Sequence, residues 1–284
     1  MANGWINGFL GVLIFSGSLP ATRMAVIDFD PLFLTSIRAT IAALLALLLL
    51  LLFRQKRPSR RQILSLLIVA SGVVVGFPFL TALALQHITA SYSVVFIGLL
   101  PITTAMFGAI RAGERPSRVF WIFSCLGSVL VAGYALTEGV ETSLQGNIYM
   151  VLAILVCGLG YAEGAKLSKT LGGWQVISWA LLFSFPLMII LTLYSLPETF
   201  DNVGEAAWAG LVYVSIFSML IGFVFWYRGL AQGGIAAVSQ LQLLQPFFGL
   251  ALAAFLLGET VGWMMIVVTL AVTLCVAGAK HFAR

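Results

Sequence analysis

The sequence predicts an all-α integral membrane protein with ten transmembrane helices, arranged as two inverted five-helix repeats around a central cavity. Three observations support this prediction: an apolar composition, charge-free runs of membrane-spanning length, and an internal repeat. Of the 284 residues, 61% are hydrophobic and only 9% are charged, whereas a soluble domain carries about a quarter charged residues. This composition excludes a soluble globular protein and a disordered chain. The basic residues lie between apolar runs rather than on one face, which excludes a nucleic-acid binder.

The first five helices follow from the gaps between charged residues, because a helix needs about 20 apolar residues to cross the hydrocarbon core. Residues 1–22 carry no charge, and the second helix begins after Asp28-Phe29-Asp30-Pro31. Residues 62–110 are also free of charge, which leaves room for two crossings divided at Gln86-His87. Gly113-Glu114-Arg115-Pro116-Ser117 precedes the fifth helix. We therefore expect helices at residues 4–25, 31–53, 62–85, 88–110 and 117–137.

The last five helices follow in the same way. Charge-free runs cover residues 142–162, 170–197, 206–227, 229–258 and 260–279. The seventh helix is preceded by Gly172-Gly173, a pair that is typical of a turn. The connections between these runs are short, so no extramembrane domain is expected. We place the five helices at residues 145–166, 174–195, 205–227, 234–257 and 261–280.

The distribution of Lys and Arg indicates how the chain is oriented. With these helices, thirteen basic residues fall on one side of the membrane, Arg23 falls on the other, and Arg38 lies inside the second helix. Cytoplasmic loops carry an excess of Lys and Arg, so both termini are predicted to be cytoplasmic. The thirteen residues are Arg54, Lys56, Arg57, Arg60, Arg61, Arg111, Arg115, Arg118, Lys166, Lys169, Arg228, Lys280 and Arg284.

The chain contains an internal repeat of about half its length. Pro101 is followed after eleven residues by Gly113-Glu114, and Pro246 is followed after eleven residues by Gly258-Glu259, an offset of 145 residues. Gly76-Phe77-Pro78-Phe79 matches Gly222-Phe223-Val224-Phe225 at an offset of 146 residues. Residues 1–138 and 144–284 are therefore predicted to be two five-helix repeats. An odd number of crossings inverts the second repeat, and inverted repeats are typical of transporters with a midplane substrate site.

These features together resemble a known family of transporters. The P-x6-R pattern of Pro31 and Arg38, the paired P-x11-G-E and the two five-helix halves are similar to the drug/metabolite transporter superfamily, EamA branch. Within that branch the chain is most similar to the bacterial YddG-type exporters of aromatic amino acids. The resemblance implies a basket of ten helices whose central cavity is lined by helices one, three, four, six, eight and nine. It also implies export of small metabolites across the bacterial inner membrane.

The ninth predicted helix carries the strongest candidate substrate site. Gln240, Gln242 and Gln245 need hydrogen-bond partners there, because hydrocarbon offers none. Gln242 and Gln245 share a face, whereas Gln240 points nearly opposite. Pro246 cannot donate to the carbonyl of Gln242, which predicts a kink. A polar cluster beside a broken helix suits substrate binding, and the alternative is hydrogen bonding between packed helices.

The fourth predicted helix carries an aromatic pair before a second kink. Pro101 frees the carbonyl of Ile97 as Pro246 frees that of Gln242. Tyr92 and Phe96 are four residues apart and face the same direction. They form either a cavity wall that stacks on an apolar ligand or part of the outer aromatic belt.

Acidic residues near the predicted helix ends admit both structural and functional interpretations. Glu163 is the one carboxylate well inside a predicted span, and Lys166 follows it at ion-pair spacing. We favour a structural Glu163–Lys166 pair, with proton coupling or ammonium binding by Glu163 as the alternative. Glu114 and Glu259 stand just before the fifth and tenth helices, where an acid stabilises the positive helix N-terminus.

Arg38 lies seven residues past Pro31, about 10 Å into the second helix at 1.5 Å per residue. Its guanidinium suits a substrate carboxylate. However, the resemblance places this helix at the periphery, where the head group reaches outward, so we expect a structural role off the cavity. Aromatic groups would then dominate the cavity and favour substrates with apolar side chains.

The remaining candidate cavity residues are Ser16, Phe79, Tyr161 and Trp226, and the remaining candidate kink sites are Pro20 and Pro78.

These patterns predict a secondary transporter that exports aromatic or hydrophobic amino acids and related small amphipathic compounds by alternating access. The chain has no G-x4-G-K-[ST] loop, so ATP is not expected to drive it directly. The alternatives are an exporter of another small metabolite or drug of the same superfamily, a channel, or an intramembrane enzyme. The predicted spans lack the charge rings, Asp pair, zinc ligands or Ser/His arrangement that a channel or an enzyme would need. We expect no cofactor, metal or catalytic centre, and no partner beyond the small-molecule substrate and the lipid bilayer; a monomer suffices.

Overall fold

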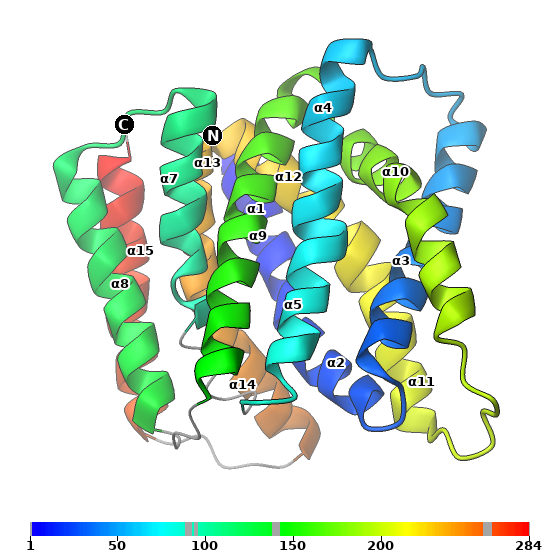
Figure 1. Ribbon diagram of the computed structural model, residues 1–284. Coiled ribbons are helices and arrows are strands. Elements are labelled where there is room, and N and C mark those ends of the chain that lie inside the picture. Colours follow the sequence, from blue (N-terminus) through cyan, green and yellow to red (C-terminus); the bar gives the residue numbers. More distant parts are fainter. Residues whose placement is uncertain (1, 89–92, 94–95, 138–142, 258–262, 284) are drawn as a thin grey trace.

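The computed structural model describes residues 2–88, 93, 96–137, 143–257 and 263–283, and within them the chain is helical with no strand (Figure 1). Two segments, η1 and η2, are π-helical, and η3 is a 3-10 helix. The elements of the first half are α1 Ala2–Ser16, α2 Ser18–Val26, α3 Pro31–Leu52, α4 Arg60–Val69, η1 Ala70–Gly76, α5 Phe77–Ala84, α7 Leu100–Ala112 and α8 Arg118–Thr137. Those of the second half are α9 Leu144–Leu171, α10 Gly173–Tyr194, α11 Glu205–Val212, η2 Tyr213–Ile221, α12 Gly222–Gly233, α13 Ile235–Ser239, η3 Gln240–Leu244, α14 Gln245–Leu257 and α15 Trp263–Phe282.

The all-helical membrane architecture is confirmed. In the described chain, six continuous helical stretches are long and apolar enough to cross a membrane, namely Asn3–Val26, Pro31–Leu52, Arg60–Ala84, Leu144–Leu171, Gly173–Tyr194 and Glu205–Gly233. They match the first, second, third, sixth, seventh and eighth predicted helices. The fifth and tenth contain shorter apolar helices, Arg118–Tyr134 and Ile266–Phe282. The fourth lies partly outside the described residues and the ninth is divided, so the count of ten crossings stays a prediction.

Helices in the two halves begin at matching positions. The N–H of Phe77 donates to the carbonyl of Gly72, and the N–H of Gly222 donates to that of Phe217. These two bonds are 145 residues apart, and both have the i→i−5 pattern of a π-helix. In Figure 1, α8 and α15 run in opposite directions, as do α3 and α10. Three pairs of helices begin 145 residues apart: α4 and α11 at Arg60 and Glu205, α5 and α12 at Phe77 and Gly222, and α7 and α14 at Leu100 and Gln245.

The principal helix contacts join one half of the chain to the other. α1 packs against α12, α3 against α10, α8 against α15, and α9 against η1 and α5. Glycine makes the α1–α12 approach possible, because a Cβ on Gly229 would lie 2.5 Å from the amide nitrogen of Gly8. Such small residues let membrane helices pack with their backbones close together.

The two ends of the helix bundle carry opposite charge. Figure 1 shows that α1 begins and α15 ends at the end where α3 connects to α4 and α7 connects to α8. We call this the basic end, because residues 54–61 and 111–118 lie there and contain eight of the thirteen Lys and Arg residues predicted to be cytoplasmic. The opposite, acidic end carries the α2–α3 connection with Asp28 and the α10–α11 connection with Asp201. There, the N–H of Gly204 donates to Asp28 at 2.9 Å.

Candidate functional site

A cavity lies between the two halves of the bundle. Its volume is about 70 Å³, room for a few water molecules at about 10–15 Å³ each. Binding a larger solute therefore requires the walls to move apart. The described residues that line it are Phe15, Ser18, Thr22, Arg38, Val73, Phe77, Pro78, Thr81, Ile97, Leu100, Tyr161, Ser218, Phe223, Gln242 and Gln245.

The cavity forms where helices are interrupted. Phe15 and Ser18 flank the break between α1 and α2 at Gly17. Phe77 and Phe223 follow the π-helical segments η1 and η2. Irregular backbone at membrane depth is tolerated only where it is buried in protein or lines a cavity, and π-helical segments occur frequently at functional sites. The interruptions therefore position the cavity wall.

All four candidate kink prolines lie in the first turn of a helix that follows an interruption. Pro20 is in α2 after Gly17, and Pro78 is in α5 after η1. Pro101 is in α7 after a turn at residues 98–99, and Pro246 is in α14 after η3. The first turn tolerates proline because its missing N–H has no intrahelical partner there. Of the four, Pro78 itself lines the cavity.

One wall of the cavity is polar and incompletely hydrogen-bonded. Ser18 and Ser218 bond to each other across the halves at 2.8 Å, and Gln245 donates to the carbonyl of Phe15 at 3.4 Å. Gln242 is 1% exposed, and neither its side-chain oxygen nor its nitrogen has a hydrogen-bond partner in the described chain. Buried polar atoms are nearly always paired. An unpaired amide facing a cavity is therefore a group available to a ligand.

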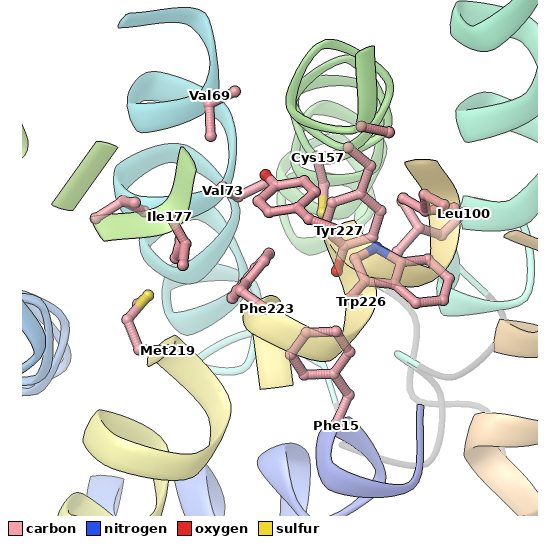
Figure 2. Close-up of a cluster of buried hydrophobic side chains, with 14 of the residues drawn as sticks. Phe15, Val69, Val73, Leu100, Cys157, Ile177, Met219, Phe223, Trp226 and Tyr227 are labelled. Carbon is pink, nitrogen blue, oxygen red and sulfur yellow. The ribbon is translucent and has the colours of Figure 1, made fainter. Parts of the chain in front are cut away.

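Aromatic side chains form another part of the cavity lining. The ring of Phe15 lies 5.0 Å from that of Phe223, and the ring of Tyr161 lies 5.9 Å from that of Phe223. Trp226 packs behind these rings, 5.5 Å from Tyr161, and does not line the cavity. Figure 2 shows Phe15, Phe223 and Trp226 gathered together from α1 and α12. This aromatic cluster gives the cavity an apolar surface beside its polar wall.

Arg38 lines the cavity, and the expectation that it lies off the cavity is wrong. α3 packs against α10 on one side and against η2 and α5 on others, which turns Arg38 inward. The residue is 8% exposed, and its Nε has no hydrogen-bond partner among the described residues. The sequence did hold a signal, because Arg38 is the basic residue inside a predicted span, and such a residue marks a functional site by default.

Glu163 lies away from the cavity in an ion pair. Its carboxylate accepts from Arg111 Nε at 2.9 Å and from the hydroxyl of Ser65 at 2.6 Å. The predicted partner Lys166 is thus corrected to Arg111. The physical reason is that α7 packs along α9 and brings its basic last turn to Glu163. This contact ties the first half of the chain to the second at the basic end.

Glu114 makes a second bridge between the halves at the basic end. It was expected to stabilise the N-terminus of the fifth helix, but its carboxylate accepts from the backbone N–H groups of Ile235 at 2.8 Å and Ala236 at 2.7 Å. These are the first residues of α13. The acid therefore stabilises a helix N-terminus of the other half, where unpaired N–H groups favour negative charge. Glu259, its counterpart, lies outside the described residues.

The remaining candidates that the structure describes do not line the cavity. The hydroxyl of Ser16 donates to the carbonyl of Val12 at 2.8 Å within its own helix. Phe79 is half-buried and Phe96 is buried, and neither lines the cavity. Tyr92 lies outside the described residues. Tyr161, Gln242, Gln245 and Pro78, all predicted from the sequence, line the cavity together. Phe15 was not predicted, and neither were Ser18, Thr22, Thr81 and Ser218, which no motif distinguishes from other hydroxyl residues.

Known proteins share this architecture and sequence. The EamA-like transporter family matches the chain twice, over residues 2–136 and 144–279. The uncharacterized transporter YdeK of Bacillus subtilis is 65% identical over 282 residues, covering 99% of this chain and 98% of YdeK. A probable terminal-alkyne amino-acid exporter of Streptantibioticus cattleyicolor is 22% identical, covering 88% of this chain and 84% of the exporter. One solved crystal structure, 16% identical, has the same fold with a TM-score of 0.79 over 97% of both chains.

The family match covers nearly the whole chain, and it divides where the helix pattern divides. A relative of 65% identity over almost its full length agrees with it. The six apolar spans agree with a protein that crosses the membrane several times. The chain therefore belongs to the EamA-like transporter family and is a multi-pass membrane transporter.

Proposed function

We propose that this protein is a secondary transporter that exports aromatic or hydrophobic amino acids, and related small amphipathic compounds, across the bacterial inner membrane. The observation that carries the proposal is a cavity between the two halves whose lining combines polar side chains with aromatic rings. A ligand that fits both walls has a polar head and an apolar side chain. Alternating access would open this cavity first to the cytoplasm and then outward.

The proposal includes two inverted repeats, residues 1–138 and 144–284, with ten crossings. The 145-residue offset between helix starts supports it, because chance would not repeat the spacing in three helix pairs. The opposite directions of α3 and α10 and of α8 and α15 support the inversion (Figure 1). In transporters built this way, the substrate site lies near the midplane between the repeats.

The chemistry of the cavity supports the substrate class. Phe15, Tyr161 and Phe223 offer ring faces and edges to an apolar side chain, and an aromatic pair contributes about 0.5–1.5 kcal/mol beyond the area it buries. No Asp or Glu lines the cavity among the described residues. A lysine side chain would be buried there without a counter-ion, which is costly. The amino-acid exporter of Streptantibioticus cattleyicolor is a distant relative of matching class.

Counterflow into proteoliposomes tests the proposal. Purified protein is reconstituted, and uptake of labelled phenylalanine, tryptophan, leucine, lysine and glutamate is compared against vesicles preloaded with the same solute. We expect phenylalanine to move faster than lysine or glutamate and to show saturation and exchange, as a carrier does. Faster lysine or glutamate uptake would contradict the substrate class, and uptake that neither saturates nor exchanges would indicate a channel.

The charge difference between the two ends predicts that the basic end faces the cytoplasm. Both termini lie at that end (Figure 1). Short epitope tags fused to each terminus should therefore resist protease added outside intact cells and be cut after the cells are opened. Cleavage of either tag in intact cells would refute the orientation.

Gln242 is predicted to bind substrate rather than to stabilise the fold. Its amide makes no hydrogen bond of good geometry to the described chain, although the Tyr161 side chain lies beside it, so Gln242→Leu should leave the folded yield unchanged. Loss of one hydrogen bond to substrate costs about 1 kcal/mol, which should slow counterflow about fivefold. Gln240→Leu is the matched control, because Gln240 lies on the same helix, is equally buried and does not line the cavity. Equal transport by both variants would rule out Gln242 as a ligand.

The Arg111–Glu163 ion pair is predicted to hold the two halves together at the basic end. Arg111→Gln leaves a carboxylate that is 1% exposed without its counter-ion. Because Arg111 itself is 40% exposed, we expect a loss of about 1–3 kcal/mol, between the values for surface and buried pairs. Thermal unfolding in detergent should show that adding Glu163→Gln restores most of this loss. Arg115→Gln is the control, and equal effects of Arg111→Gln and Arg115→Gln would contradict the prediction.

A further inference from the structure

We propose that Arg38 binds the carboxylate of the transported solute and so restricts transport to compounds that carry an anionic group. This inference rests on the proposed function, since it assigns a substrate group to a residue of the same cavity. It goes beyond that function by naming the group that every substrate must present. It also assigns a function to Arg38, a charged residue that was expected from the sequence to lie away from the cavity.

The first observation is that Arg38 carries a buried charge for which no described residue supplies a counter-ion. The side chain is 8% exposed and faces the cavity, and its Nε has no hydrogen-bond partner in the described chain. The cavity contains no carboxylate from any described residue. In contrast, the buried carboxylate of Glu163 has both an arginine and a serine partner. The fold therefore satisfies one buried charge and leaves the other open toward the cavity.

The second observation is that Arg38 lines the cavity together with other polar side chains that lack hydrogen-bond partners. Gln242, which is 1% exposed, also lines the cavity with both side-chain polar atoms unpaired. The hydroxyl of Thr81 lines it as well and is unpaired too. A guanidinium offers five N–H donors in a planar fork that matches a carboxylate. With an amide and a hydroxyl beside it, this fork forms a site suited to an amino-acid backbone or another organic acid.

The positions of Arg38 and Tyr161 along their helices predict how a bound solute is oriented in the cavity. Arg38 lies seven residues past Pro31, which begins α3 at the acidic end, or about 10 Å along the helix. Tyr161 lies seventeen residues past Leu144, which begins α9 at the same end, or about 25 Å along that helix. The carboxylate would therefore point toward the acidic end, and the side chain would lie deeper, among the aromatic rings.

Charge selection follows from this arrangement. A zwitterionic amino acid or an organic acid supplies the missing negative charge. An amine without a carboxylate brings a second positive charge into a low-dielectric site, where like charges repel strongly. The cavity should therefore reject the amide of an amino acid while accepting the acid, although the two have nearly the same size and side chain.

The test compares acid and amide in matched variants. Counterflow and ligand-induced thermal shift are measured with phenylalanine, phenylalanine amide and 3-phenylpropionate on the wild type, Arg38→Met, Arg38→Lys and Arg23→Gln. Arg23 is the matched control, because it is an exposed arginine of α2 that does not line the cavity. The wild type and Arg23→Gln should favour the acid over the amide by at least about tenfold, the effect of one charge-assisted hydrogen bond. Arg38→Met should abolish this preference, and Arg38→Lys should retain only part of it.

A stability measurement separates binding from a structural role. Replacing a buried, unpaired charge with an apolar residue of similar length is neutral or stabilising. Arg38→Met should therefore keep or raise the unfolding temperature without ligand, while losing the shift that 3-phenylpropionate gives the wild type. A lowered unfolding temperature together with an unchanged preference for the acid would overturn the proposal.

The two proposals can fail separately. If the wild type transports phenylalanine and its amide equally and Arg38→Met does the same, the Arg38 inference is overturned and the exporter proposal stands. If no labelled amino acid is transported but 3-phenylpropionate stabilises the wild type and not Arg38→Met, the anion site stands and the amino-acid proposal is wrong. If neither acid changes transport or stability of the wild type, both are overturned.

Discussion

The requirement that every backbone N–H and C=O inside the membrane finds a partner governs the structure. Hydrocarbon offers no hydrogen bonds, so the chain is helical wherever lipid surrounds it. The helices are interrupted at Gly17, in η1 and η2, and in η3, and residues beside each interruption line the same cavity. Buried residues of η1, η2 and η3, namely Val73, Ser218 and Gln242, lie on the cavity side of these segments. The cavity and the breaks therefore depend on each other, because irregular backbone also frees carbonyls and turns side chains toward a ligand.

Buried charged side chains also need partners inside the membrane. They fall into two groups, one with a structural role and one assigned to transport. Glu163 and Glu114 are each satisfied by the opposite half of the chain, one by Arg111 and the other by the N-terminus of α13. These contacts stabilise one arrangement of the halves, and the proposed alternating access would require them to break. Arg38 is different, because no described residue supplies a counter-ion. A charged residue inside a membrane span is costly and by default indicates a functional site.

The sequence predicted the features that depend on order along the chain. The length of the apolar, charge-free runs predicted the membrane spans. The matched spacing around Pro101 and Pro246 predicted the 145-residue repeat, which the helix starts follow. It did not predict features that depend on how helices face each other. Arg38 was placed outward because its inward direction is set by the packing of α3 on α10 and η2. Glu163 was paired with Lys166 at local spacing, whereas its partner Arg111 comes from another helix.

The contacts between the halves at the two ends bear on the proposed alternating access. At the basic end the halves are joined by an ion pair and by two hydrogen bonds to Glu114, and at the acidic end Asp28 accepts from Gly204. A solute can shift the balance between two conformations only by binding one more tightly than the other. A carboxylate on Arg38 does this if the guanidinium is desolvated in one conformation and hydrated in the other. Because Arg38 lies toward the acidic end, opening that end would hydrate both charges, weaken their attraction and release the solute outward.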